Sequence, residues 1–195
     1  MKKALLPIPI LLLGLLLAAC SGGTSQVKRT PIPTLIPATL AAPSGAGRLA
    51  SLSGGERCAV QAVDLIGAWV SAGSPETTPF DFTDASGKAC QGTFANDVRF
   101  LFTESNVWFD GALACSACHG PDLAASYANM NLGDYQGILA GSRRQSAGAK
   151  GSDILGGGDW TKARLNQVLI TRFMPLGRPQ TSPEKGPLVM VGKVK

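Results

Sequence analysis

Histidine is almost absent from this sequence, whose 195 residues contain one, His119. A metal held by two imidazoles of the same chain is therefore excluded, and so are His-rich zinc sites. Charged residues are also sparse, at 16%, and 18 basic against 13 acidic residues give a formal net charge of +5. This excess is too small to indicate a dedicated nucleic-acid binder, so we expect no nucleic-acid partner. With 45% hydrophobic residues the chain is nevertheless apolar enough to form a packed core.

The amino terminus lacks an apolar segment of the length that a membrane-spanning helix usually has. Two lysines are followed by sixteen uncharged residues, 4–19, which is short for the hydrocarbon core. A basic start, an apolar stretch and small residues at the end predict an export signal. Its last residues, Leu17 to Cys20, resemble the lipobox of bacterial lipoproteins. That resemblance implies cleavage after residues 1–19 and a lipid on Cys20, which would anchor the chain on the outer face of the cell membrane. An uncleaved helical anchor is the alternative.

Residues 20–49 have no core-forming periodicity. They are rich in Ser, Gly, Thr, Ala and Pro, which predicts a semi-extended linker, with a packed strand as the alternative. The folded domain is then expected over residues 50–195.

The domain is predicted to be mainly α, with long glycine-rich loops. Apolar residues recur at helical spacing over 62–70, and Asn96 is placed to cap a second short helix. A third helix is expected from Tyr135 to Gly141, and a fourth after Asp159 that ends before Pro175. No two-residue alternation is long enough to predict a sheet, and the tail over 179–195 is expected to be frayed or to bind a partner as a strand.

The remaining cysteines point to one cofactor. Residues 115–119 read Cys-Ser-Ala-Cys-His, the attachment sequence for c-type haem. Cys115 and Cys118 would bond to the two porphyrin vinyl groups, and His119 would be the proximal iron ligand. A thioredoxin-like dithiol would need a long helix where Gly-Pro follows the motif, and zinc would need a further ligand from Cys58 or Cys90. A structural Cys115–Cys118 disulfide would be strained and would give His119 no role.

Cys58 and Cys90 are left as a pair. In an exported protein they most simply form a structural disulfide, which should stabilise the fold by about 3–4 kcal/mol.

Because His119 is the one histidine, the distal iron position is left for methionine, lysine, another weak donor or water, or it is empty. Of the methionines after Cys20, Met130 lies too close to His119 in the sequence to reach the opposite haem face. Met190 lies in the tail, whereas Met174 directly precedes Pro175 and should leave its helix on a loop. Met174 is therefore the predicted distal ligand.

With these motifs the chain resembles class I cytochromes c over roughly residues 57–178. Segment 97–102 resembles the family's first helix, and segment 130–138 resembles its middle helix. The family's closing helix has no counterpart after Met174, but segment 63–76 resembles it. The resemblance thus implies a cytochrome c-like fold that is circularly permuted, with helix 59–72 packed on helix 96–104 so that Trp69 lies near Val98 and Phe102.

A haem with both axial positions filled is typical of an electron carrier rather than an enzyme. The lipid-anchored single-haem layout is similar to the monohaem cytochrome subunit of alternative complex III, a quinol-oxidising assembly, and to small anchored electron donors. We therefore expect redox proteins as partners, in a membrane complex or through a free-standing shuttle. A haem enzyme or sensor with an open distal position is the alternative.

Further residues are candidates for the haem pocket or for docking. Tyr135, Trp160 and Phe173 are candidate pocket residues, although each can equally belong to the core. Residues 50–139 carry 3 basic and 10 acidic residues, whereas residues 140–195 carry 10 basic and 3 acidic ones. The two halves either neutralise one another or build a basic docking face, for which the candidates are Arg143, Arg144, Lys162 and Arg164.

Overall fold

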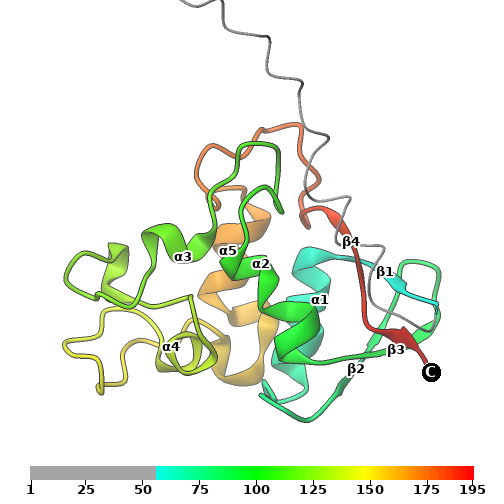
Figure 1. Ribbon diagram of the computed structural model, residues 1–195, viewed down its shortest axis with the longest axis horizontal. Helices are drawn as coiled ribbons and strands as arrows, with labels where there is room; N and C mark the ends of the chain where they lie inside the picture. Colours follow the sequence, from blue (N-terminus) through cyan, green and yellow to red (C-terminus); the bar gives the residue numbers. More distant parts are fainter. Residues whose placement is uncertain (1–55) are drawn as a thin grey trace, which may run out of the picture. The chain divides into compact units, whose positions relative to one another are not determined.

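The computed structural model describes residues 56–195, which alternate short strands with short helices (Figure 1). The predicted signal peptide over 1–19, the lipidated Cys20 and the linker over 20–49 lie outside the described residues, as does the domain boundary at 50. The elements are β1 (Cys58–Gln61), α1 (Ala62–Ser71), β2 (Phe80–Thr83), β3 (Ala89–Gly92), η2 (Phe94–Val98), α2 (Phe100–Thr103), α3 (Cys115–Cys118), η3 (Tyr127–Asn129), α4 (Tyr135–Ala140), η4 (Gly156–Gly158), η5 (Trp160–Lys162), α5 (Arg164–Ile170), β4 (Leu188–Val191) and β5 (Lys193–Val194).

The prediction of a mainly α, cytochrome c-like domain is wrong. Over the described residues 32% are helical and 14% are in strands, which form two small antiparallel sheets, β1–β4 and β2–β3–β5. The alternation that marks a strand is present, since Phe80 and Phe82 are buried while Asp81 and Thr83 are exposed. This alternation spans only four residues, which is too few to distinguish a strand from a loop in the sequence. The partners of β4 and β5 also lie about a hundred residues or more earlier in the chain.

The expected helices are present, and most are short. α1 ends at Ser71, and Gly73 follows with a φ of +85°. The second helix begins at a different cap, because the side chain of Thr93 accepts from the backbone N–H of Asn96. Asp159 caps the 3₁₀ turn η5, and α5 starts only after it. Outside α1, each helix of the described residues has seven residues or fewer.

An aromatic cluster holds α1 against the helices on either side of it. The ring of Trp69 lies 5.0 Å from that of Phe94 and 6.3 Å from that of Tyr135. On another face, a Cβ added to Gly67 would lie 2.5 Å from the Trp160 ring, so glycine permits α1 to approach η5. α1 also contacts η2 and α5. α1 therefore packs on η2 through Trp69 and Phe94, a residue that precedes the predicted helix 96–104. The predicted proximity of Trp69 to Val98 and Phe102 stays a prediction.

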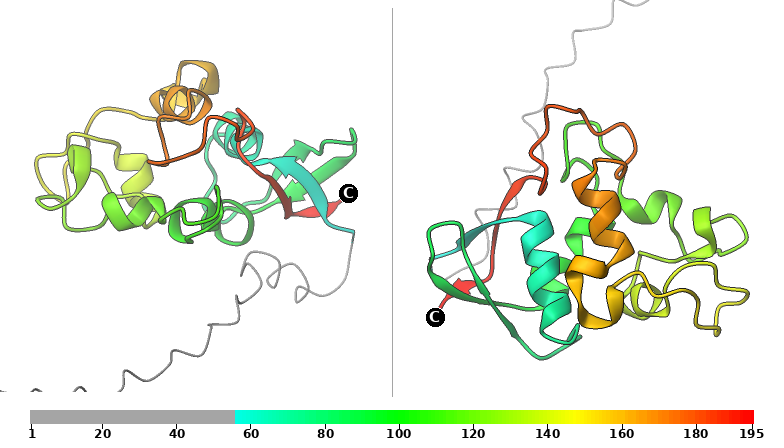
Figure 2. Two further views of the ribbon diagram at one scale, coloured as in Figure 1. Left: turned by 90° about the horizontal axis from the view of Figure 1, so that it is seen from above. Right: turned by 180° about the vertical axis from the view of Figure 1, so that it is seen from behind.

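The C-terminal segment is part of the fold, not a frayed tail or a free strand. β4 pairs with β1, with Val191 opposite Cys58, and β5 pairs with β3. Between them the backbone N–H of Gly192 donates to the buried carboxylate of Asp97 at 2.7 Å. Both views in Figure 2 agree with Figure 1 that the strands gather at one end of these residues and that α3 and α4 lie at the other.

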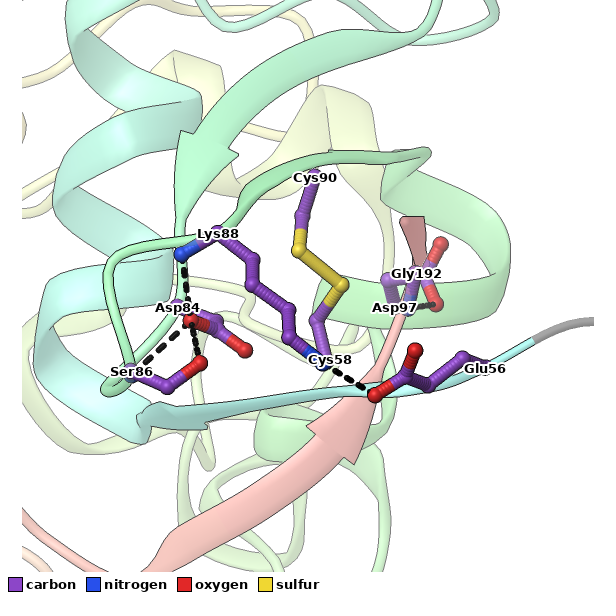
Figure 3. Close-up of a disulfide and its surroundings, with 8 residues drawn as sticks. All are labelled: Glu56, Cys58, Asp84, Ser86, Lys88, Cys90, Asp97 and Gly192. Carbon is purple, nitrogen blue, oxygen red and sulfur yellow. Dashed lines mark hydrogen bonds and ion pairs between the residues drawn. A yellow bond between two sulfur atoms is a disulfide. The ribbon is translucent and has the colours of Figure 1, made fainter. Parts of the chain in front are cut away.

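The predicted Cys58–Cys90 disulfide is confirmed (Figure 3). Both cysteines are fully buried, and they join β1 to β3. The bond therefore connects the two sheets. No helix among residues 56–195 is both long enough and apolar enough to span a membrane.

Candidate functional site

The motif over 115–119 forms a single helical turn, α3. The backbone N–H of His119 closes the turn on the carbonyl of Cys115 at 2.9 Å. Residues three apart on a helix lie on one side of it, so Cys115 and Cys118 share a face. Both are free thiols and both are half-buried. The turn thus presents two thiols side by side, with an imidazole at its end.

The imidazole of His119 is buried and oriented by the backbone. Its exposed fraction is 6%, and Nδ1 lies 2.8 Å from the carbonyl oxygen of Tyr127. A carbonyl only accepts, so Nδ1 carries the proton and Nε2 is the basic nitrogen. Among the described residues Nε2 has no hydrogen-bond partner. A backbone carbonyl on one ring nitrogen is the usual orientation of a histidine that binds a metal through the other.

The thiol of Cys115 is kept protonated by its surroundings. Burial, chiefly, raises its pKa to about 11. Its Sγ lies 3.7 Å from the carbonyl oxygen of Leu101 in α2, and α2 contacts α3. This environment is opposite to that of a redox-active dithiol, whose nucleophilic cysteine has a lowered pKa.

Met174 lies, as predicted, on the loop after a helix. α5 ends at Ile170, and the backbone N–H of Met174 donates to the carbonyl of Val168 at 3.0 Å. The side chain is half-buried. The thioether therefore belongs to a loop and not to a helical face.

The Met174 loop packs on the segment that leads into the motif. The guanidinium of Arg178 lies over the ring of Trp108, with 5.6 Å between its carbon and the ring centroid. The indole Nε1 of Trp108 donates to the carbonyl of Leu101 at 2.8 Å, the same oxygen that faces Cys115. The structure thus joins the loop of Met174 to the turn of Cys115 through two side chains and one carbonyl.

The other two candidate methionines lie elsewhere. Met130 is half-buried against the core, and its carbonyl accepts from the Ser126 hydroxyl at 2.5 Å. Met190 lies in β4 opposite Ala59, in the sheet that includes the N-terminal strand. Neither position changes the preference for Met174.

The three candidate pocket residues do not act as a group. Tyr135 belongs to the aromatic cluster around Trp69, and its hydroxyl donates to the carbonyl of Ser74 at 2.7 Å. Trp160 packs on Gly67. Phe173, beside Met174, is 64% exposed. Tyr135 and Trp160 are therefore half-buried against the core, and a place in a haem pocket stays a prediction for all three residues.

Large apolar side chains are exposed beside the motif and beside Met174. Leu113 and Tyr127 flank the turn and its histidine, and Phe173 and Leu176 flank the methionine. Each exposes more than 60% of its surface. Exposed apolar side chains indicate surfaces that a ligand or a partner covers.

The basic second half of the chain is partly neutralised by the first. Lys185 pairs with Asp64 at 2.9 Å and Lys195 pairs with Asp81 at 2.8 Å. The proposed docking residues are partly engaged as well, since Lys162 pairs with Asp159. Of the other three, Arg144 donates to the carbonyls of Ala147 and Ala149, whereas Arg143 and Arg164 are exposed. A docking face built from these four residues stays a prediction.

A surface pocket of about 510 Å³ lies next to the motif but does not include it. It is lined by residues that follow the motif, by α4 and by the loop over 144–150, among them Pro121, Leu123 and Asn131. Cys115, Cys118, His119 and Met174 do not line it. We assign this pocket no role in the site.

One further cluster has the composition of a metal site. The ligand atoms of Cys58, Asp84 and Cys90 lie within 4.8 Å of one another (Figure 3). Because the two sulfurs are bonded to each other, they have no thiolate to offer a metal. The Asp84 carboxylate instead accepts from the backbone of Ser86 and Lys88, each at 2.8 Å, and closes the turn between β2 and β3.

Two residues of this site were not found from the sequence. Trp108 lies seven residues before Cys115, and the sequence does not distinguish it from an aromatic residue that simply packs in the core. Arg178 follows a Gly in a Pro-rich loop, where a basic residue usually indicates solvent exposure. Their roles depend on contacts between segments about 70 residues apart, which the sequence pattern does not reveal.

No family model, no curated protein and no solved structure matches this chain.

Proposed function

We propose that this chain is a c-type cytochrome that carries single electrons. One haem is bound covalently through Cys115 and Cys118, with His119 as the proximal and Met174 as the distal iron ligand. The observation that carries the proposal is the orientation of His119. Its Nδ1 is occupied by the Tyr127 carbonyl, and its Nε2 is left as a ligand atom at the end of a turn that presents two free thiols. The proposal rests on this site and not on a fold class.

The dithiol alternative is disfavoured by the environment of Cys115. An oxidoreductase needs a thiolate near neutral pH, whereas burial raises the pKa of this thiol to about 11. α3 also ends after a single turn, so the long helix that follows such a motif, with the thiol near its N-terminus, is missing over these residues.

The zinc alternative is disfavoured by the positions of the other cysteines. A structural zinc site takes four ligands, and in the described residues the candidate cluster is built around Cys58 and Cys90, not around the motif. Those two cysteines form a disulfide. Within residues 56–195, Cys115, Cys118 and His119 are therefore left without a fourth protein ligand of the usual kind.

In this account each residue has a definite task. When bound, the haem supplies an iron that alternates between its ferrous and ferric states. Cys115 and Cys118 would hold the haem covalently, the Tyr127 carbonyl orients the His119 ring as one iron ligand, and Met174 would supply the other. With both His119 and Met174 bound, substrates would have no access to the iron, so the proposed role is that of a carrier and not an enzyme.

The proposed cellular setting follows from the N-terminal sequence. We place the domain outside the cell membrane, anchored by lipid on Cys20, with redox proteins of a membrane electron-transfer complex as its partners. A quinol-oxidising assembly similar to alternative complex III is the proposed context.

Covalent attachment provides the direct test. The full chain would be exported in a host with a haem-attachment system, purified, denatured and analysed by intact mass and haem staining. We expect one haem to remain on the denatured chain, and Cys115→Ser and Cys118→Ser each to remove one of its two bonds. The double variant Cys58→Ser with Cys90→Ser is the matched control and should retain the haem. A chain that carries zinc or no haem under these conditions would overturn the proposal.

A further inference from the structure

Arg178 is a buried arginine in the loop that carries Met174. The residue exposes 4% of its surface. Its Nη1 donates to the carbonyl of Leu169 at 2.8 Å, and its Nη2 donates to the carbonyls of Glu184, at 3.0 Å, and of Pro183. Its own backbone N–H donates to the carbonyl of Pro175 at 3.2 Å. One side chain thus binds three carbonyls from two segments.

The charge of this arginine is not neutralised by a carboxylate. None of the ion pairs among the described residues includes Arg178, and its Nε is buried without a hydrogen-bond partner. Burial, followed by the nearby charge of Arg172, lowers the pKa of the guanidinium. A buried cation without a counter-ion is costly, and a hydrophobic residue would fill the same space more cheaply. Its three hydrogen bonds to backbone carbonyls point to a role in the geometry of the loop.

The three carbonyls lie on both sides of Met174 in the sequence. Leu169 belongs to the last turn of α5, before the methionine, whereas Pro183 and Glu184 follow it by about ten residues. Between them Phe173 and Leu176 are exposed while Pro175 is buried, so packing holds only part of this loop. The guanidinium, stacked on Trp108, closes the base of the loop.

We infer that Arg178 is the positioning residue for Met174: it holds the loop closed so that the thioether stays at the iron. This inference rests on the proposed function. Arg178 does not touch the iron, and it acts through the carbonyls at the two ends of the loop. Lysine cannot replace it fully, because a single ammonium group does not reproduce the planar fork that reaches both ends.

The test measures how easily an added ligand displaces Met174. Imidazole is titrated into the oxidised holoprotein, and its dissociation constant is compared among the wild type, Arg178→Met, Arg178→Lys and the control Arg99→Met. Arg99 is an exposed arginine at the start of α2 and has no part in the proposed site or docking face. We expect imidazole to bind at least tenfold more tightly to Arg178→Met, with an intermediate effect for Arg178→Lys and a change of less than twofold for Arg99→Met.

A second readout separates positioning from general loss of structure. The weak near-infrared band of a methionine–iron(III) bond should weaken in Arg178→Met and partly recover in Arg178→Lys, while far-ultraviolet circular dichroism stays unchanged. Equal imidazole affinity in wild type and Arg178→Lys, together with an unchanged band, would overturn the inference even if Arg178→Met fails to fold. A band that persists in Met174→Ala would instead mean that Met174 is not the ligand, which is a failure of the proposed function.

Discussion

The guanidinium of Arg178 lies over the indole of Trp108, 5.6 Å from the ring centroid. That indole donates to the Leu101 carbonyl, which also faces the Sγ of Cys115. Residues 63 positions apart, Cys115 and Arg178, are therefore connected through one aromatic side chain. The methionine loop therefore contacts Trp108, whose indole shares the Leu101 carbonyl of α2 with Cys115.

Trp108→Phe removes the donor to the Leu101 carbonyl while keeping an aromatic ring. We expect it to lower the free energy of unfolding by about 1–3 kcal/mol, because a buried carbonyl loses its partner. Urea denaturation measures this loss. The matched control is Trp160→Phe, whose indole has no hydrogen-bond partner among the described residues and which should lose less. Equal losses in the two variants would contradict a role for the hydrogen bond.

The raised pKa of Cys115 predicts the pH dependence of its reactivity before haem attachment. The thiolate is the nucleophile, so raising the pKa from 9.0 to about 11 lowers the thiolate fraction at neutral pH. Alkylation of Cys115 in the haem-free chain should therefore be slow at pH 8 and increase towards a midpoint near pH 11. Mass spectrometry of peptides from alkylated samples measures the rate, and circular dichroism confirms that the chain stays folded. A midpoint at or below the ordinary value would mean that this thiol is not buried in solution.

The Cys58–Cys90 disulfide predicts a loss of stability without a change in the cofactor. The two residues are 32 positions apart, and the chain-entropy relation gives about 3–4 kcal/mol for a loop of this length. Replacing both cysteines by alanine should lower the free energy of unfolding by about that amount in urea denaturation. The haem spectrum should stay unchanged, since the bond joins β1 and β3 at the end of the domain away from α3. A shifted spectrum would indicate that the sheets support the haem site directly.

The local parts of this structure were accessible from the sequence. Helical periodicity predicted α1 and α4 closely, and the spacing of residues 115–119 predicted two thiols and an imidazole together at one turn. Such features depend on residues a few positions apart. The disulfide was predicted by elimination, because the other three cysteines were assigned to the lipid signal and to the motif over 115–119.

The sheets were missed for a physical reason. Four-residue strands carry too little alternation, and the pairing of β4 with β1 joins residues about 130 positions apart. The buried Asp97, which accepts from the backbone of Gly192, is similarly unpredictable, because a carboxylate inside the fold depends on a distant N–H donor. The role of Arg178 was equally unpredictable, because its acceptors are backbone carbonyls, which every residue has.

The most direct test of the account is the visible and near-infrared absorption spectrum of the purified full chain, oxidised and reduced. We predict a low-spin c-type spectrum with the weak ferric near-infrared band of methionine ligation, lost in Met174→Ala and retained in Met190→Ala. A high-spin spectrum that shifts on addition of peroxide or carbon monoxide would contradict it, because the iron would then have an open position and the protein would be a haem enzyme or sensor.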